Sequence, residues 1–330
     1  MMTNAPLTIS VVIPTHNRAS SLEETLRDLA GQTTHQQFTY EVIVADNNST
    51  DQTQSVVEQL SRDYPVPLTY LFEGKQGRPC ALNTGIRQAA GEIIAMTDDD
   101  TRLSSTWLST IYHTFQRYQA DGVGGPTTPL WIGSRPHWLS DRLLRQLGIM
   151  DHGPSTFRVT DPQASFIGPN CAFRKSLFAT LGGFDEDRKI GSSEDTEWFL
   201  RVFHAGHTLI YQPAMAIQHK VDTKRWTKQT LARRFFQQGR ACAFGLQEGG
   251  TGRSLCRVPL WVVRFFLGLH WQALKCWLQG DREEALWHWL RRYFYLGAIV
   301  YCFKDWLERR PMQRPRPAIL QNAPSASLKT

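Results

Sequence analysis

The stretch Ile93-Ile94-Ala95-Met96-Thr97-Asp98-Asp99-Asp100 joins a short apolar run directly to three carboxylates. The apolar run is long enough for a buried strand, and the carboxyl ends of strands are where open α/β sheets bind ligands. Adjacent carboxylates resist being ionised together unless a cation or hydrogen-bond donors neutralise them. Oxygen ligands at such a place suit Mg²⁺ or Mn²⁺, with substrate phosphates and water filling the other positions. A solvated acidic turn is the alternative for the triplet alone.

Two earlier segments have the same character. Leu7–Pro14 and Tyr40–Ala45 are apolar, β-branched runs, and polar residues follow each of them. Helical patterns lie between the strands, which predicts βαβ units and an α/β fold with a mostly parallel sheet. Because the carboxyl ends of parallel strands meet at one edge, we expect the polar residues after the three strands to converge there. These residues are His16, Asn17, Asp46, Asn47, Asp98, Asp99 and Asp100.

Local signals support these elements and exclude some nucleotide-binding classes. Ser20 and Glu23 have the spacing of a capping box, which predicts a side-chain cap for the first helix. No G-x-G-x-x-G follows the first strand, so an NAD-type site is disfavoured. A P-loop is excluded because the chain contains no G-x-x-x-x-G-K-[ST] motif.

The distribution of charge indicates what kind of partner the chain binds, and its cysteines indicate the cellular compartment. The net charge is +7, but residues 1–220 hold 18 basic and 23 acidic side chains, whereas residues 221–330 hold 19 and 7. A basic rear segment predicts an anionic partner. The six cysteines are scattered without a C-x-x-C pair, which argues against zinc and disulfides and fits the cytoplasm. Met1–Pro6 lacks the pattern of a signal peptide.

Further motifs occur with a characteristic order and spacing over roughly residues 7–225. They are Val11–Arg18, Glu41–Asp51, Gly77–Asn83, Thr97–Asp100, Gly168–Arg174 and Gly182–Asp185 followed by Glu194-Asp195. Together these motifs resemble the family 2 glycosyltransferases of the GT-A fold. His16 and Asn47 depart from the family pattern, which often has Tyr and Asp there, and we expect these positions to affect the choice of nucleobase.

The resemblance implies a nucleotide-sugar donor, UDP- or GDP-linked, and a divalent cation, Mn²⁺ or Mg²⁺. Asp98 and Asp100 would hold the cation on the diphosphate, and His219 falls where many members carry a further metal ligand. The alternative for His219 is a histidine with a purely structural role. Arg78 would contact the nucleotide or its phosphates, and the alternative is that it only faces solvent. The residues that the resemblance assigns to donor binding are Pro14, Thr15, His16, Asn17, Asp46, Asn47, Arg78, Asp98, Asp99 and Asn170.

Asp195, with Glu194 beside it, is the candidate catalytic base. It precedes the apolar pattern that begins at Trp198, so we expect it near the N-terminus of a helix, where carboxylates are favoured. The alternative role for Asp195 is therefore a simple helix cap. A carboxylate that deprotonates the acceptor gives one in-line displacement and inversion at the anomeric carbon. No separate carboxylate nucleophile for a two-step route stands out.

Residues 226–310 form a basic, Trp-rich region that we predict to be helical. Its apolar runs, Pro259–Leu269 and Phe294–Phe303, are shorter than the ~20 residues needed to span a bilayer. Trp, Arg and Lys together suit peripheral contact with a membrane, although a helical subdomain packed on the catalytic domain is the alternative. We find no nucleic-acid recognition module. Residues 311–330 are predicted to be a disordered tail.

These observations favour a catalytic domain at residues 1–225 and an inverting, metal-dependent glycosyltransferase. It would transfer a sugar to a hydroxyl of a lipid-linked or polysaccharide acceptor at the cytoplasmic face of the membrane. A sugar-phosphate nucleotidyltransferase is an alternative, but its usual Gly-rich phosphate loop is missing after the first strand. A second alternative is a catalytically inactive, membrane-bound assembly partner. The intact residues Asp98–Asp100 and Asp195 argue against it.

Overall fold

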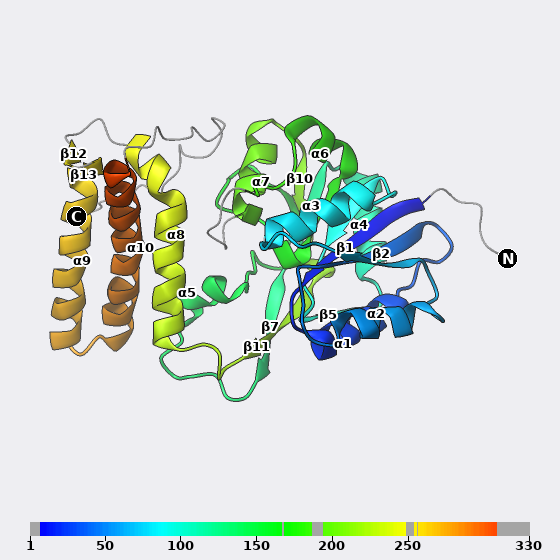
Figure 1. Cartoon of the computed structure of the whole chain (residues 1–330), viewed down its shortest axis with the longest axis horizontal. Coiled ribbons are helices and arrows are strands. Elements are labelled where there is room, and N and C mark those ends of the chain that lie inside the picture. Colours follow the sequence, from blue (N-terminus) through cyan, green and yellow to red (C-terminus); the bar gives the residue numbers. More distant parts are fainter. Residues whose placement is uncertain (1–6, 167, 187–193, 249–253, 256, 309–330) are drawn as a thin grey trace. The chain divides into compact units, whose positions relative to one another are not determined.

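A computed structural model describes residues 7–166, 168–186, 194–248, 254–255 and 257–308 (Figure 1). Within them the chain divides into two compact units. The first comprises residues 7–132, 142–186 and 194–222, and the second comprises residues 133–141 together with the described part of 223–308. The boundaries predicted for a catalytic and a helical domain stay predictions. The predicted tail, residues 311–330, lies outside the described residues.

An eight-stranded sheet forms the centre of the first unit (Figure 1). Its strands, in chain order, are β1 (Leu7–Thr15), β2 (Thr39–Asp46), β3 (Leu68–Phe72), β4 (Ile93–Met96), β6 (Gly122–Gly124), β8 (Phe157–Arg158), β9 (Cys171–Arg174) and β10 (Leu209–Tyr211). The order across the sheet is β3-β2-β1-β4-β9-β6-β10-β8. β3, β2, β1 and β4 are mutually parallel, whereas β9 is antiparallel to both of its neighbours. The predicted α/β class is therefore confirmed.

Register brings the carboxyl ends of the first strands to one edge. Thr15, at the end of β1, pairs with Asp46 at the end of β2, and Val12 pairs with Met96 at the end of β4. The polar residues that follow these strands therefore start from neighbouring positions, as expected for parallel strands that end together.

Helices cover both faces of this sheet because its strands are apolar on both sides. Ile9, Val11 and Ile13 of β1 pack with one set of helices, and Val12 packs with the other. The first set is α1 (Ala19–Ala30), α2 (Thr53–Ser61) and α4 (Trp107–Tyr118); the second set is α3 (Arg78–Gln88), α6 (Lys175–Leu181) and α7 (Glu194–His204). The remaining short helices before residue 222 are α5 (Asp141–Leu144), η1 (Arg145–Leu147), η2 (Gly168–Asn170) and η3 (Pro213–Met215).

The predicted capping box of the first helix is wrong. The N-cap of α1 is Arg18, two residues before Ser20, and no side chain of the helix's own N-terminus caps it. Instead Oδ2 of Asp51 accepts the Ala19 N–H at 3.1 Å from the turn after β2. Glu23, the second residue of the expected box, pairs with Arg27 along the helix surface. A long-range contact therefore replaces the local one.

A second, three-stranded sheet lies beside the acidic triplet. It contains β5 (Thr101–Leu103), β11 (Ile217–Asp222) and β7 (Thr127–Ile132), in that order. β11 runs antiparallel to β5, and His219 pairs with Thr101. The backbone N–H of Lys220 also donates to the carbonyl of Asp100 at 2.9 Å. This pairing carries a late segment of the chain to the triplet.

Three long helices, α8 (Lys228–Glu248), α9 (Leu260–Leu278) and α10 (Arg282–Leu307), make up most of the second unit, together with the short strands β12 (Ser254–Leu255) and β13 (Val258–Pro259). α10 packs against both α8 and α9 (Figure 1). Gly239 and Gly297 permit a close crossing of α8 and α10: a Cβ at Gly297 would lie 2.0 Å from the carbonyl oxygen of Phe236. None of the helices in the described part of the chain is both long and apolar enough to cross a membrane.

Candidate active site

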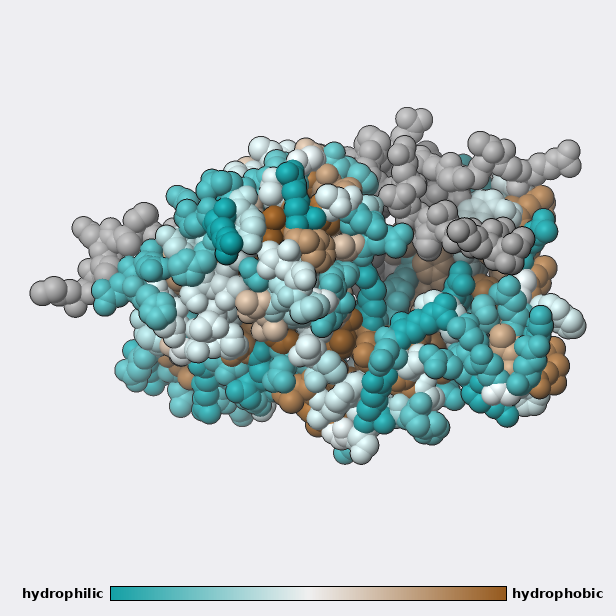
Figure 2. All heavy atoms as spheres, turned by 180° about the vertical axis from the view of Figure 1, so that it is seen from behind, coloured by the Kyte–Doolittle hydropathy of each residue, from teal (hydrophilic) through white to brown (hydrophobic). Residues whose placement is uncertain are grey.

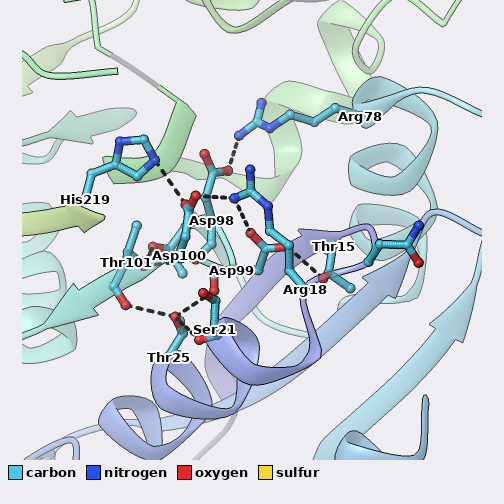
Figure 3. A network of polar contacts seen from close by, with 12 residues as sticks. Thr15, Arg18, Ser21, Thr25, Arg78, Asp98, Asp99, Asp100, Thr101 and His219 are labelled. Atoms are coloured by element: carbon cyan, nitrogen blue, oxygen red, sulfur yellow. Dashed lines mark hydrogen bonds and ion pairs between the residues drawn. The ribbon is translucent and has the colours of Figure 1, made fainter. Parts of the chain in front are cut away.

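The three carboxylates of the triplet point in different directions (Figure 3). Asp98 Oδ1 accepts a hydrogen bond from Nη2 of Arg78 at 2.7 Å. Asp99 faces Thr15, whose Oγ1 donates to it at 2.7 Å. Asp100 faces His219, with Oδ1 lying 3.0 Å from Nε2 of the imidazole. The backbone turn between β4 and β5 thus distributes three neighbouring negative charges among separate partners.

Asp98, Asp100 and His219 form a group of potential metal ligands. One ligand atom from each residue lies within 4.8 Å of the others. The group exists because β11 pairs with β5 directly after the triplet, which places His219 opposite Asp100. Two carboxylates and an imidazole are a donor set that fits Mn²⁺, and the carboxylates also suit Mg²⁺. Asp99 is outside this group.

The charges around this group shift several pKa values. Burial raises the pKa of Asp99 to about 6, with Arg18 acting in the opposite direction. Burial also works against the ionised form of Asp100, but the hydrogen bond to His219 and the charge of Arg18 lower its pKa. His219 is largely buried, which lowers the pKa of its imidazole, but Asp100 acts in the opposite direction and the pKa is raised overall. The arrangement therefore favours a charged Asp100, the form that binds a cation.

Arg18 is a residue of this site to which the sequence motifs assign no role. It precedes α1, and its Nη1 lies 3.0 Å from Oδ1 of Asp99 and also contacts Asp100 (Figure 3). Its side chain remains 31% exposed, so the guanidinium can also reach ligands from solvent. The signal in the sequence is its position directly after Asn17, at the end of the first strand.

Arg78 connects the triplet to the start of α7. Its Nη1 donates to Oε1 of Glu194 at 3.1 Å while Nη2 holds Asp98. Burial opposes its charge, but Asp98, Glu194 and Asp195 together raise its pKa. A Cβ at Gly168 would lie 2.7 Å from Nη2 of Arg78, so glycine at that position leaves room for the guanidinium. The solvent-facing alternative for Arg78 does not describe this structure.

Asp195 lies in the first turn of α7, and both of its oxygens accept backbone hydrogen bonds. Oδ2 accepts the Gly168 N–H at 2.9 Å, and Oδ1 accepts the Thr196 N–H at 2.7 Å. Burial and the neighbouring carboxylate of Glu194 raise the pKa of Asp195, whereas Arg78 acts to lower it. A raised pKa brings a carboxylate closer to the value that suits a general base near neutral pH.

The residues predicted for the donor pocket lie along the same sheet edge, with different exposure. Pro14 is buried within β1, whereas His16 and Asn17 are exposed. His16 Nδ1 lies 2.9 Å from the carbonyl oxygen of Asn47, which links the ends of β1 and β2. Asn17 has a φ of 53° and accepts the Thr50 N–H at 2.7 Å. His16 and Asn17 are therefore available to a ligand at this edge.

Asp46 and Asn47 make mostly internal contacts. Asp46 is 1% exposed, and its two oxygens accept from the Ser49 N–H at 2.9 Å and the Tyr70 hydroxyl at 2.7 Å. Asn47 Nδ2 donates to the Lys75 carbonyl at 2.8 Å, and its Oδ1 accepts the Gly77 N–H at 2.7 Å. Asn47 thus ties β2 to the loop that introduces Arg78, and a direct contact with the nucleobase stays a prediction.

Asn170 has a different position from the one expected for a donor-binding residue. Its side chain is 0% exposed, and its Nδ2 donates to the carbonyls of Pro126 and Met215 at 2.9 and 2.7 Å. Its Oδ1 accepts from Nε1 of Trp107 at 3.0 Å. The amide is fully used inside the protein, so we correct its assignment: Asn170 positions the segment around Gly168 rather than contacting the donor.

Comparison with known protein families decides the identity of the first unit. The family model described as glycosyl transferase family 2 matches residues 10–182, just over half of the chain. The chain belongs to this family. The glycosyltransferase motifs proposed from the sequence up to Gly182 lie within the matched region, and Glu194, Asp195 and His219 follow it.

Individual relatives agree with this assignment. This chain is 28% identical over 254 residues to the succinoglycan biosynthesis protein ExoM of Rhizobium meliloti, and the alignment covers 76% of this chain and 79% of that protein. Its fold is similar to the mannosyltransferase PcManGT from Pyrobaculum calidifontis in complex with GDP-Man and Mn²⁺, with a TM-score of 0.55, 22% identity and coverage of 94% and 77%. It is also similar to S. aureus TarS 1–349 in complex with UDP, with a TM-score of 0.52, 16% identity and coverage of 96% and 98%.

The predicted GT-A fold and transferase activity are therefore confirmed. Membership of the family excludes the alternative that the chain is a sugar-phosphate nucleotidyltransferase. Because the family is one of transferases, it also disfavours the alternative of a catalytically inactive assembly partner. The two solved structures are less than 25% identical to this chain, so what they show of it is its fold.

Proposed function

We propose that this glycosyltransferase moves a sugar from a UDP- or GDP-sugar to a hydroxyl of a lipid-linked or polysaccharide acceptor, with inversion at the anomeric carbon. The observation that carries the proposal is the position of Arg78. Its Nη2 donates to Asp98 and its Nη1 donates to Glu194. The Arg78 side chain therefore lies between Asp98, a proposed metal ligand, and Glu194, the neighbour of the proposed base Asp195. The name of the ExoM relative supports a polysaccharide-type acceptor.

Asp98, Asp100 and His219 would hold Mn²⁺ or Mg²⁺. The ion would supply Lewis-acid stabilisation of the diphosphate that leaves. Two properties of the site support this assignment: the ligand atoms converge within 4.8 Å, and the ionised form of Asp100 is favoured. The Mn²⁺ that accompanies GDP-Man in the PcManGT complex also supports it.

The chain's own side chains would perform the remaining steps. Arg18 and Arg78 present guanidinium groups beside the triplet, where they would bind the oxygens of the diphosphate. Asp195 would accept the proton of the acceptor hydroxyl. As the bond from the acceptor oxygen to the anomeric carbon forms, the bond from that carbon to the diphosphate oxygen breaks, and the nucleoside diphosphate leaves with the electron pair. One displacement of this kind inverts the anomeric configuration.

The stereochemistry of the product tests this proposal. With a donor that the protein binds and an acceptor that it glycosylates, the coupling constant of the new anomeric proton in ¹H NMR should report the configuration opposite to that of the donor. Retention would overturn the single in-line displacement.

The dependence of turnover on pH tests the base. Asp195 works as a base only when ionised, and its pKa is raised, so turnover should be lost on acidification at a higher pH than an ordinary aspartate would require. Glu194→Gln removes a charge that raises this pKa, so the acidic limb of kcat should move to lower pH. Glu197→Gln is the matched control on the same helix, because the Glu197 carboxylate pairs with Arg201 instead. Equal acidic limbs in wild type and Glu194→Gln would contradict the assignment.

A further inference from the structure

Helix α9 is apolar on two faces. Val262 and Leu269 lie on the face that is buried within the helical unit, at 1% and 3% exposure. A second face carries large apolar side chains that are 45–71% exposed. We call these five residues the α9 stripe: Leu260, Leu267, Trp271, Leu274 and Leu278.

Helix geometry makes these residues one continuous surface. They are separated by 7, 4, 3 and 4 positions. At 3.6 residues per turn this spacing keeps all of them within a sector of about 60°, along a helix about 28 Å long. Figure 2 shows apolar side chains at the edge of the helical unit that α9 forms. A helix of a soluble unit normally presents polar residues on its outer face, and a contiguous apolar surface marks an interaction site.

Cations accompany the stripe. Arg264 and Lys275 are exposed on α9, both on the same side of the stripe and within about 70° of its centre. The segment Leu260–Leu278 contains no Asp or Glu. Apolar side chains, a tryptophan and flanking long cationic side chains on one helix suit the boundary between lipid headgroups and acyl chains.

The charges also distinguish among partners. A second copy of this chain packed stripe to stripe, with the two α9 helices antiparallel, would bring its own Arg264 and Lys275 towards those of the first copy. Repulsion would result, because α9 supplies no carboxylate to pair with either cation. An anionic lipid surface offers phosphates to these cations and hydrocarbon to the leucines. A spanning orientation is not available, since α9 is not apolar enough to cross a membrane.

We propose that the α9 stripe docks this protein on an anionic membrane surface, with α9 lying in the plane of the interface. Leu267, Trp271 and Leu274 enter the headgroup and acyl boundary, while Arg264 and Lys275 contact lipid phosphates. The cytoplasmic leaflet, with its negative surface potential, is the surface that this chemistry fits. The inference goes beyond the proposed transfer reaction, because it rests on a different unit of the chain and would stand for any acceptor.

Vesicle co-sedimentation of the full chain tests the proposal. Wild type should bind vesicles of phosphatidylcholine with phosphatidylglycerol more tightly than vesicles of phosphatidylcholine alone, and high salt should remove only part of the binding. Trp271→Glu should weaken binding by roughly tenfold or more, because it places a charge within the stripe. Gln272→Glu is the matched control: it adds the same charge at the next, exposed position of α9, outside the stripe, and should have a much smaller effect.

A second variant separates the electrostatic part. Arg264→Gln combined with Lys275→Gln should weaken binding to anionic vesicles by about fivefold for each cation and leave binding to neutral vesicles unchanged. Circular dichroism establishes that each variant is folded. Equal effects of Trp271→Glu and Gln272→Glu, or a wild-type protein that ignores both kinds of vesicle, would overturn the proposal. A wild-type dimer that Trp271→Glu converts to monomer would assign the stripe to a second copy instead.

Discussion

Replacing Asp195 with Asn is expected to lower turnover by roughly 10²–10⁴-fold, the usual contribution of a general base. The substitution removes the proton acceptor but keeps the size of the side chain. Nucleotide binding should survive, because the substitution leaves in place Arg18 and Arg78, the proposed diphosphate ligands, and the proposed metal ligands around Asp100. The measurement is kcat for nucleoside diphosphate release in the presence of acceptor, together with the Kd of the nucleotide.

A control is needed because Asp195 also has a structural role. Its two oxygens accept the N–H groups of Gly168 and Thr196, and an asparagine can accept through only one atom. Asp161→Asn is a suitable comparison, since Asp161 also accepts a backbone N–H, from Gln163 at 2.8 Å, but is not one of the proposed site residues. Wild-type turnover in folded Asp195→Asn protein would show that the base is another group.

The second large effect is expected for Asp100→Ala. Removing this carboxylate takes away one proposed metal ligand and the partner of His219. Binding of UDP or GDP should weaken by roughly 10²-fold, since the cation and the diphosphate support each other, whereas uridine or guanosine should lose little. The measurement is a titration of each ligand in the presence of Mn²⁺.

The contrast between ligands separates this effect from unfolding. Equal losses for the diphosphate and the bare nucleoside would indicate a general disturbance of the fold. Asp28→Ala provides the comparison for a lost ion pair, because Asp28 of α1 holds Arg102 at 2.7 Å and is not one of the proposed ligands. That variant should keep the difference in affinity between the diphosphate and the nucleoside.

The strands that present the site could be predicted from the sequence because their signals are local. Ile93–Met96 is a buried apolar run, and the structure has β4 with these bounds. The polar residues after β1, β2 and β4 converge because parallel strands in register end together. This topology requires only the alternation of apolar strands and helices that can be read directly along the chain.

The contacts that complete the site are long-range and were harder to predict. His219 reaches Asp100 through the pairing of β11 with β5, which no local pattern specifies. The sequence motifs assign no role to Arg18, because a single arginine in a loop carries no sign of the distant carboxylates that it contacts. Motif position predicts that Asn170 binds the donor, but its amide is buried between Trp107 and two backbone carbonyls. Motif position alone does not separate a residue that touches a ligand from one that supports the loop.

Direct titration of nucleotide sugars is the measurement that tests the central claim, that the group of Asp98, Asp100 and His219 supports a metal-dependent donor site. A panel of UDP- and GDP-sugars is titrated against the full chain with Mn²⁺ and again with a chelator. We expect at least one donor to bind with Mn²⁺ and to lose most of its affinity with the chelator or in Asp100→Ala. A donor that binds equally well under all three conditions, or a panel in which none binds, would contradict the account.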